Sequence, residues 1–509
     1  MKNTKSEFSF FSYPKSIYTH ITDLKVLDEN IWLKNGRKKL NELKEFTANN
    51  VPAFSQHLQK HNLMKKQVID SQDLSVIPFI TKKNYIKEYS FTDLIPKDKL
   101  GKITTFASSS GTTGKQSYFP REENQDSIYE YILELLLLNQ FNIQGKKTLC
   151  ILGFALGIWI GGIFSYKVLN SLGKKGHSIS TVPVGNDKDL FLEILKDLAP
   201  SFDQVILLGY PPFIKEIVDN AVLKKINLKK LNIKIITAAE AFSENFRDYL
   251  VAKTGIKNKF TDIANIYGTV ELGTMAHETP ASVLVRNLAR ANKQLFQAIF
   301  PDANDLPVLT QYYPYLTFFE EYNNELIASG YGSAIPLIKY KLNDTGGVLT
   351  FTEMISKMAG LGIDFHKEAE KAKISHTIFK LPFVYISGRS DMVLVYGGAN
   401  IWPENIKSAL LKSDITSFVT GKFTIFKNET SDYNSELIIN VELSKNTLVR
   451  KEIEEKITDI IIDTLCRENK EFKDTFSNGN IKPPKIALYS YGDKKYFSPS
   501  VKQKWMIIR

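Results

Sequence analysis

The second quarter of the chain alternates short β-branched runs with amphipathic stretches of helical spacing. Strands are predicted at Lys147 to Phe154, Val205 to Leu208 and Ile233 to Thr237. Helices are predicted at Pro212 to Asn220 and Ser243 to Thr254. Because consecutive parallel strands need a crossover between them, this alternation predicts an α/β fold with mainly parallel β-sheets and flanking helices.

The pattern changes after Asp391. Short strands and amphipathic helices are predicted there at Val393 to Tyr396, Glu404 to Leu411, Phe423 to Phe426, Glu436 to Val441 and Arg450 to Leu465. Before Asp391, later strands are predicted at Leu326 to Ser329 and Val348 to Thr352. A chain of 509 residues is too long for one hydrophobic core. We therefore predict a large domain over residues 1–390 and a small α+β domain over residues 391–509.

The chain is basic, with a formal net charge of +11. Its lysines are spread along the whole sequence, and no arginine-rich arm is present. This distribution favours a general lysine-rich surface over a nucleic-acid site, so no nucleic-acid partner is expected. A positive field also suits substrates that carry phosphates.

Other features of the sequence favour a cytoplasmic protein without a membrane span. The two cysteines, Cys150 and Cys466, are too few for a disulfide framework. Residues 1–13 lack the pattern of a signal peptide. The longest apolar run, Leu149 to Phe164, is short for a membrane helix and contains four glycines, so we assign it to the protein core.

A loop rich in glycine and hydroxyl residues runs from Thr104 to Gly114, with Lys115 next. Such a loop offers backbone N–H and hydroxyl donors to an anion. It is not a Walker A loop, because Ser109 stands where that motif needs its first glycine. From these residues alone, a phosphate-binding loop and a flexible linker both remain open.

Further segments follow this loop in a fixed order. They are Ser109 to Lys115, Ala238 to Glu240, Asn265 to Glu271, Pro336 to Asp344, Gly388 to Asp391 and Gly397 to Pro403. Together they resemble the motifs of the acyl-adenylate-forming ligases, known as the ANL superfamily. Three more segments are similar to phenylacetate–CoA ligases: Pro52 to Phe54, Pro78 to Lys83 and Gly157 to Gly162.

The resemblance implies an enzyme that activates a carboxylic acid with ATP and Mg²⁺. The phosphate loop would then bind the departing pyrophosphate through Ser109, Ser110, Gly111, Thr112, Thr113, Gly114 and Lys115. Glu271 would hold Mg²⁺ through a carboxylate oxygen. Read alone, Glu271 is also compatible with a surface glutamate beside a turn.

The resemblance also assigns the residues that bind the adenosine. The backbone at Ala239 and Glu240 would frame the adenine, and Tyr267, followed by Gly268, would stack against it. Asp344 would accept hydrogen bonds from both ribose hydroxyls, and Arg389 would reach ribose or phosphate oxygens. Without the family context, Tyr267 is more typical of a core residue and Asp344 of a turn residue.

In this family the small domain is mobile and serves two half-reactions. Asp391 is the hinge candidate, and the Gly397–Gly398 loop would let the pantetheine arm of coenzyme A pass close to the backbone. The catalytic lysine is expected near the C-terminus at Lys502, with Lys504 as the competing candidate. A solvated basic tail is the alternative interpretation of both lysines.

The sequence departs from the family pattern at several positions. Val270 replaces the usual Thr or Ser, and Val501 replaces a glycine. Thr269 could supply the missing hydroxyl, so it joins the catalytic candidates. The segment Leu272 to His277, directly after Glu271, contains no cysteine, so no structural zinc is expected there. The segment from Pro280 to Pro314 is also atypical.

The nature of the acid and of the acceptor is less constrained. Three aromatic side chains make an aromatic or medium-sized apolar acid the expected substrate: Trp159, Tyr210 and Phe213. Coenzyme A is the expected acceptor. Alternatives are a carrier-protein phosphopantetheine, an amine, or a non-catalytic relative that only binds nucleotide or acyl ligand.

Overall fold

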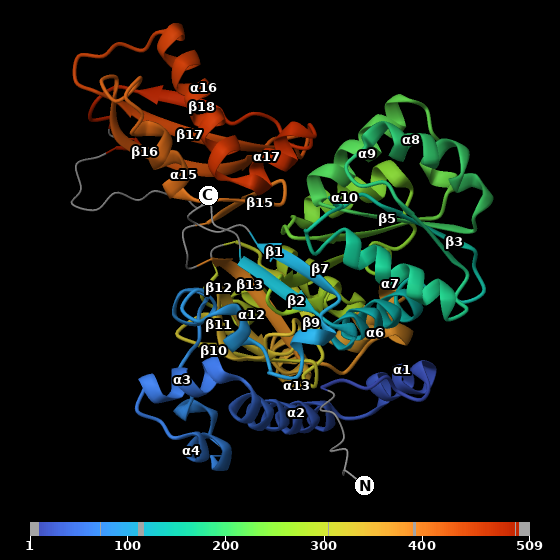
Figure 1. Cartoon of the computed structure of the whole chain (residues 1–509). Coiled ribbons are helices and arrows are strands. Elements are labelled where there is room, and N and C mark those ends of the chain that lie inside the picture. The colour runs from blue at the N-terminus through green and yellow to red at the C-terminus, as the bar shows by residue number, and fades with distance from the viewer. Residues whose placement is uncertain are drawn as a thin grey trace. The chain divides into compact units, whose positions relative to one another are not determined.

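The computed structural model describes residues 10–71, 73–109, 117–303, 305–389, 393–493 and 495–497. The chain separates into two compact units (Figure 1). The first holds nearly all of the chain before residue 390. The second holds the chain after that point together with Tyr210–Glu216 and residues 109–116. Asp391, the candidate hinge, lies outside the described residues.

An 11-stranded sheet, counted over the described residues, runs through the first unit in the order β10-β11-β12-β13-β9-β8-β7-β6-β5-β3-β4. Its strands are β3 (Thr148–Leu152), β4 (Ile179–Pro183), β5 (Gln204–Gly209), β6 (Ile233–Ala238), β7 (Ile263–Thr269), β8 (Gly273–His277), β9 (Val308–Tyr312), β10 (Thr317–Tyr322), β11 (Glu325–Gly330), β12 (Leu337–Leu349) and β13 (Phe383–Arg389).

The pairing changes direction at β7. The strands from β4 to β7 pair in parallel. From β7 to β10 each neighbouring pair is antiparallel. The predicted α/β class is therefore confirmed, with the parallel pairing gathered in one half of the sheet. In that half, β3 and β5 are buried along their whole length, as expected for strands covered on both faces.

Helices flank the parallel half. They are α6 (Glu123–Asn139), α7 (Ile163–Lys174), α8 (Lys188–Asp197), α9 (Pro211–Leu223) and α10 (Glu244–Thr254). Leucines fill positions 133 and 135–138 of α6, and most of that helix is buried on every side. Such all-round burial identifies α6 as a core helix rather than a surface one.

The remaining helices of the first unit come from its two ends. The N-terminal ones are α1 (Ile17–Val26), α2 (Glu29–Asn50), α3 (Pro52–Lys60), α4 (Lys65–Asp70) and α5 (Phe91–Leu94). Further along the chain are α11 (Pro280–Ala291), α12 (Lys293–Ile299), α13 (Phe351–Ala359) and α14 (Phe365–Lys371). These last four helices share one apolar core with Leu309, Phe383 and Tyr385 of the sheet. The atypical segment 280–314 thus forms two helices and β9.

The second unit has its own core. Its elements are β14 (Leu394–Tyr396), β15 (Ala399–Ile401), α15 (Pro403–Leu410), β16 (Val419–Glu429), β17 (Ser435–Leu443), α16 (Lys451–Glu468), α17 (Lys470–Ser477) and β18 (Lys485–Tyr489). The order β16-β17-β18 makes a three-stranded sheet with one antiparallel and one parallel pairing. Apolar side chains of that sheet and of the three helices pack into one cluster.

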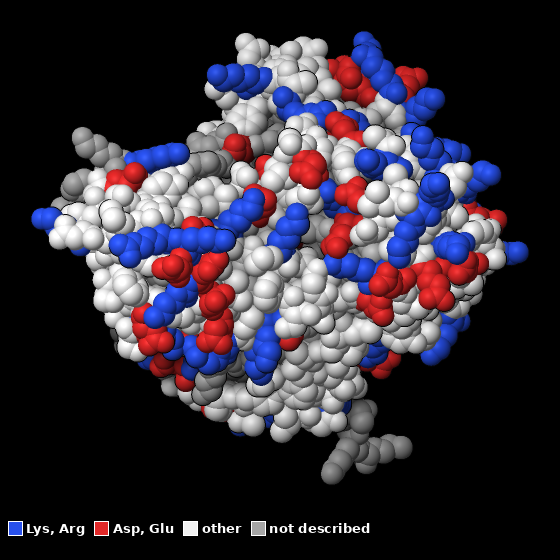
Figure 2. Space-filling model, turned by 90° about the horizontal axis from the view of Figure 1, so that it is seen from above, with Lys and Arg blue, Asp and Glu red and all other residues white. Residues whose placement is uncertain are grey.

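Charged side chains are distributed broadly over the surface. Figure 2 shows Lys and Arg scattered over the visible face, with Asp and Glu interspersed among them. Within the described residues, none of the helices combines the length and apolar character needed to cross a bilayer.

Candidate functional site

The predicted phosphate loop connects β1 (Thr105–Ser109) and β2 (Ser117–Arg121), which are neighbours in a two-stranded sheet. Ser110, Gly111, Thr112, Thr113, Gly114, Lys115 and the side chain of Ser109 lie outside the described residues. At the base of the loop, the Ser108 amide donates to the Ile158 carbonyl at 3.1 Å. The connection therefore starts from a fixed backbone position.

Arg121 anchors the other side of this base. Its side chain is fully buried. The Nε–H group donates a hydrogen bond to the Asp126 carboxylate at 3.1 Å, and Nη1–H donates one to the Gly332 carbonyl at 2.6 Å. A fully buried guanidinium needs such partners, because an unpaired charge in the core is very costly. Arg121 therefore ties β2 to α6 and to the loop after β11.

Asp344 is the centre of the best-defined part of the site. Its carboxylate is 4% exposed, accepts a hydrogen bond from the Tyr267 hydroxyl at 2.5 Å, and pairs with Arg389 Nη1 at 3.1 Å. Burial and the adjacent carboxylate raise the pKa of Tyr267 well above its usual range, so the hydroxyl stays protonated and donates. The structure thus brings together three residues that the sequence predicts for the adenosine.

Strand pairing explains why residues so far apart in the chain meet. Asp344 of β12 and Arg389 of β13 are directly paired in the sheet register. A buried carboxylate flanked by a tyrosine and an arginine is an acceptor whose chemistry suits hydroxyl groups. This geometry fits the ribose role that the resemblance implies for Asp344.

The segment expected to frame the adenine follows β6. Ala239 has a φ of 71°, a left-handed conformation that a residue with a Cβ rarely adopts. The carbonyl of the next residue, Glu240, accepts a hydrogen bond from Asn265 Nδ2 at 3.0 Å. Asn265 Oδ1 in turn accepts from the Thr237 hydroxyl at 3.2 Å. We call Ala238–Glu240 the adenine frame; the Asn265 side chain fixes it to β7.

Glu271 lies in the turn between β7 and β8. Its side chain is 9% exposed and forms an ion pair with Lys82 Nζ at 3.4 Å. The hydroxyl of Thr269 accepts from the Leu272 amide at 3.1 Å and so stabilises this turn. Thr269 therefore has a structural partner, and Val270 is buried.

Lys82 is a site residue that the sequence analysis did not assign. It begins the short helix η2 (Lys82–Ile86), and Ile80 just before it pairs with β12 through bonds to Lys339 and Lys341. The segment Pro78 to Lys83 had been noted only for its resemblance to relatives. Its pairing with a central strand places a lysine beside Glu271.

The donor set around Glu271 fits Mg²⁺ as far as the described residues go. Magnesium commonly binds through one or two carboxylates together with substrate phosphates. Glu271 supplies one hard, buried carboxylate oxygen, and Lys82 adds a positive charge suited to phosphate oxygens.

Gly332 packs directly against the turn that carries Glu271. A Cβ placed on Gly332 would lie 1.7 Å from the Leu272 carbonyl oxygen and 2.0 Å from its carbon. We expect Gly332→Ala to displace this turn and lower the Tm by about 5 °C. Gly101→Ala is the matched control, because no atom lies within 4 Å of a Cβ there. Equal Tm values for the two variants, measured by calorimetry, would contradict this packing argument.

The candidate residues for acid and acceptor fall in both units. Trp159 and Tyr210 are partly exposed, whereas Phe213 is buried. Gly397 and Gly398 form the turn of the β14–β15 hairpin with φ values of 57° and 84°. A Cβ on Gly397 would lie 2.0 Å from Ile481 Cγ2, so packing alone already requires glycine there. Lys502 and Lys504 lie outside the described residues.

Known proteins resemble this chain in sequence and in fold. No protein-family model matches the chain. The phenylacetate-coenzyme A ligase of Aromatoleum evansii is 20% identical over 377 residues, 72% of each chain. The enzyme of the same name from Pseudomonas putida is 20% identical over 368 residues, 71% of this chain and 72% of its own.

A solved structure has the same fold over nearly the whole length. 2-Hydroxyisobutyryl-CoA ligase, crystallised with 2-HIB-AMP and CoA, aligns with a TM-score of 0.65 at 14% sequence identity and covers 98% of this chain and 94% of its own. The ordered motifs, the mixed sheet and these likenesses agree with one another. The chain is therefore similar in sequence to phenylacetate-coenzyme A ligases and shares its fold with 2-hydroxyisobutyryl-CoA ligase.

Proposed function

We propose that this chain is an AMP-forming ligase that activates a carboxylic acid with ATP and then passes the acyl group to coenzyme A. In the first half-reaction a carboxylate oxygen attacks the α-phosphorus of ATP, the bond from that phosphorus to the bridging oxygen breaks, and pyrophosphate leaves. In the second, the thiol of coenzyme A attacks the acyl carbon, AMP leaves, and one proton is released.

The observation that carries this proposal is the Tyr267–Asp344–Arg389 arrangement. It offers a buried acceptor for the ribose hydroxyls within the same unit as the adenine frame and Glu271. The names of the two phenylacetate-coenzyme A ligase relatives support the same chemistry.

In this mechanism the chain mainly orients the reactants and stabilises charge. Asp344 and Arg389 hold the ribose, so the α-phosphorus has a defined position relative to the acid. Lys82 would neutralise part of the negative charge that develops on pyrophosphate, a role that the sequence also predicts for the phosphate-loop residues. Mg²⁺ held by Glu271 would supply further neutralisation of phosphate charge.

An aromatic or medium-sized apolar acid is the substrate class that we propose. The aromatic side chains Trp159 and Tyr210 are only partly buried, so their rings have surface available to a ligand. Phe213 is buried and therefore offers no such surface.

A second acceptor class has its own support. Val270 and the sequence of the segment from Pro280 to Pro314 depart from the motifs expected of the family. A carrier-protein phosphopantetheine or an amine would then take the acyl group in place of coenzyme A. The first half-reaction is the same in all three cases.

ATP–pyrophosphate exchange over a panel of acids tests the proposal. We expect at least one aromatic or medium-sized apolar acid to drive exchange that depends on the added acid. Absence of exchange with every acid, in a protein that still binds AMP, would instead identify a nucleotide-binding relative. Incubation of the active acid with coenzyme A, a phosphopantetheinyl carrier protein or amines then separates the acceptors by the product formed.

A further inference from the structure

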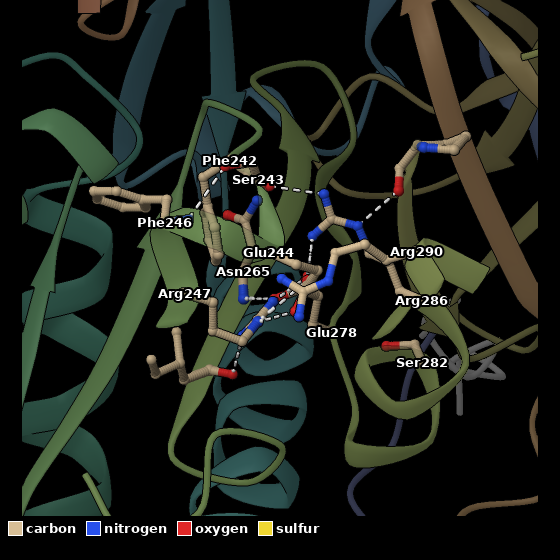
Figure 3. A network of polar contacts seen from close by, with 12 residues as sticks. Phe242, Ser243, Glu244, Phe246, Arg247, Asn265, Glu278, Ser282, Arg286 and Arg290 are labelled. Carbon is tan, nitrogen blue, oxygen red and sulfur yellow. Dashed lines mark hydrogen bonds and ion pairs between the residues drawn. The ribbon is translucent and has the colours of Figure 1, made fainter. Parts of the chain in front are cut away.

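Four charged side chains form a buried ion cluster beside the adenine frame (Figure 3). They are Glu244 and Arg247 of α10, Glu278 directly after β8, and Arg286 of α11. Their exposed fractions are 1%, 0%, 0% and 2%, so water does not screen them. Two positive and two negative charges leave the cluster formally neutral.

In this cluster, single arginine nitrogens each reach two carboxylate oxygens. Arg247 Nη2 donates to both oxygens of Glu278 at 2.7 and 2.8 Å, and its Nε donates to Glu244 at 3.0 Å. Arg286 Nη1 reaches Glu244 at 2.7 Å and Glu278 at 3.4 Å. Burial raises the pKa of Glu244, but Arg247 and Arg286 lower it more, so this carboxylate is ionised at neutral pH.

One side of the cluster bonds to the backbone of β7. Glu278 accepts a hydrogen bond from the Asn265 amide at 2.9 Å, and Arg247 Nη1 donates to the Ile263 carbonyl at 3.0 Å. Both backbone groups lie on the strand that carries Tyr267. The charges therefore fix the position of β7 just ahead of that tyrosine.

The other side of the cluster bonds to the chain that leaves the adenine frame. Arg286 Nη2 donates to the Phe242 carbonyl at 2.7 Å, and its Nε donates to the Pro307 carbonyl at 2.8 Å. The Asn265 side chain, whose own backbone is held by Glu278, donates to the Glu240 carbonyl. The frame is thus held at Glu240 and again two residues later.

Stability alone is a weak reason for such a cluster. Replacing a buried ion network with well-packed apolar side chains is often neutral or stabilising, because burying charge costs more than ion pairing returns. What apolar side chains cannot supply is a set of directed bonds to chosen backbone atoms.

Resting on the proposed function, we infer that Arg247, Glu278 and Arg286 are positioning residues for the nucleotide. These three residues fix the adenine frame relative to Tyr267. The distance between the frame and Tyr267 then sets the affinity for the adenosine part of ATP. The three positioning residues do not contact the acid or pyrophosphate in this scheme, so their effect is confined to nucleotide binding.

The main test is Arg286→Lys. Lysine keeps the positive charge beside Glu244 and Glu278, but its single ammonium group lacks the fork that also reaches Phe242 and Pro307. We expect the dissociation constant for AMP, measured by calorimetric titration, to rise about tenfold, since hydrogen bonds from charged donors are lost. KM for ATP should rise equally, while KM for acid and for pyrophosphate in exchange stays within about twofold.

Asn265→Ala is a second variant that leaves all four charges paired. It removes the bond to the Glu240 carbonyl and should weaken AMP binding to a similar degree. If Arg286→Lys does not fold, this variant still tests whether the attachment of the frame to β7 sets nucleotide affinity.

Asp262→Asn is the matched control. Asp262 pairs with Lys234 Nζ at 2.7 Å and so joins β6 and β7 at the ends of these strands that lie away from the adenine frame and Tyr267. We expect it to lower the Tm without changing the AMP dissociation constant. AMP binding at wild-type strength in folded Arg286→Lys and Asn265→Ala would overturn the inference.

The same titration separates this inference from the ligase proposal, because AMP binding requires no acid. Absence of exchange in a wild-type protein that binds AMP would count against the ligase alone. A wild-type protein that does not bind AMP would overturn both.

Discussion

Asp344→Ala should lower the efficiency of ATP use in pyrophosphate exchange by about 100-fold. The carboxylate is the proposed acceptor for two ribose hydroxyls, and a hydrogen bond to a charged group contributes about 1.5–3 kcal/mol. Losing two such bonds, each at the lower end of that range, corresponds to roughly 100-fold. The loss should appear mainly in KM for ATP and can be measured by initial rates of exchange.

Deoxynucleotides make this prediction specific. The wild-type protein should use ATP better than its 2′- and 3′-deoxy analogues. Asp344→Ala should lose the preference for at least one of the two hydroxyls. Removing the carboxylate and removing the hydroxyl then form the two sides of a double-mutant cycle. Glu325→Ala is the control. Glu325 of β11 forms an ion pair at 2.6 Å with Lys341 of β12, the strand that also carries Asp344. Undiminished discrimination in Asp344→Ala would remove Asp344 from the ribose site.

Lys502→Ala should reduce acyl-AMP formation by at least about 100-fold. A lysine that faces the charge developing on the carboxylate and the α-phosphate acts in the transition state, where one lost donor typically costs about 10²–10³ in rate. Conversion of presynthesised acyl-AMP to the final product should be unaffected, because the lysine serves only the first half-reaction in this family. Single-turnover measurements of each half-reaction check both statements.

Lys504→Ala is the paired control for this lysine, two positions along the same tail. It should retain most of the acyl-AMP formation. The reverse result, with loss in Lys504→Ala and retention in Lys502→Ala, would transfer the role to Lys504. Retention in both would identify the tail as a solvated basic segment.

The sequence predicts the fold best where strands are buried on both faces. The ranges predicted for β5 and β6 end within one or two residues of the observed strands, because continuous apolar runs between helices have few other interpretations. The antiparallel half was less apparent, since its strands follow one another without the regular helical crossovers that mark parallel pairing.

One predicted strand extends too far. Val348 to Thr352 was expected to be extended, but β12 ends at Leu349 and α13 begins at Phe351. The Thr350 hydroxyl accepts from the Glu353 amide, and the Glu353 carboxylate accepts from the Thr350 amide. This capping box starts a helix, and its Thr-x-x-Glu signature was visible in the sequence.

The candidate site was only partly predictable, for a physical reason. Ordered motifs predicted Tyr267, Asp344 and Arg389 as nucleotide residues, and the structure shows that the three lie together, although their role stays a prediction. Lys82 and Arg286 carry no comparable signal, because a single charged residue in a helix usually indicates a solvated face. The residues that contact Lys82 and Arg286 are distant from them in the sequence, so these contacts become apparent only in the folded chain.

The position of β13 determines when the nucleotide site can exist during synthesis. This strand is the last of the large sheet to be made, yet it lies between β12 and β9 and pairs with both. Until the ribosome has released residues 383–389, β9 and β12 have no common neighbour, and Asp344 has no Arg389. A nascent chain that stops before β13 therefore lacks the Asp344–Arg389 pair, and under the proposed ribose role of that pair we expect nucleotide binding to begin only once β13 has joined the sheet.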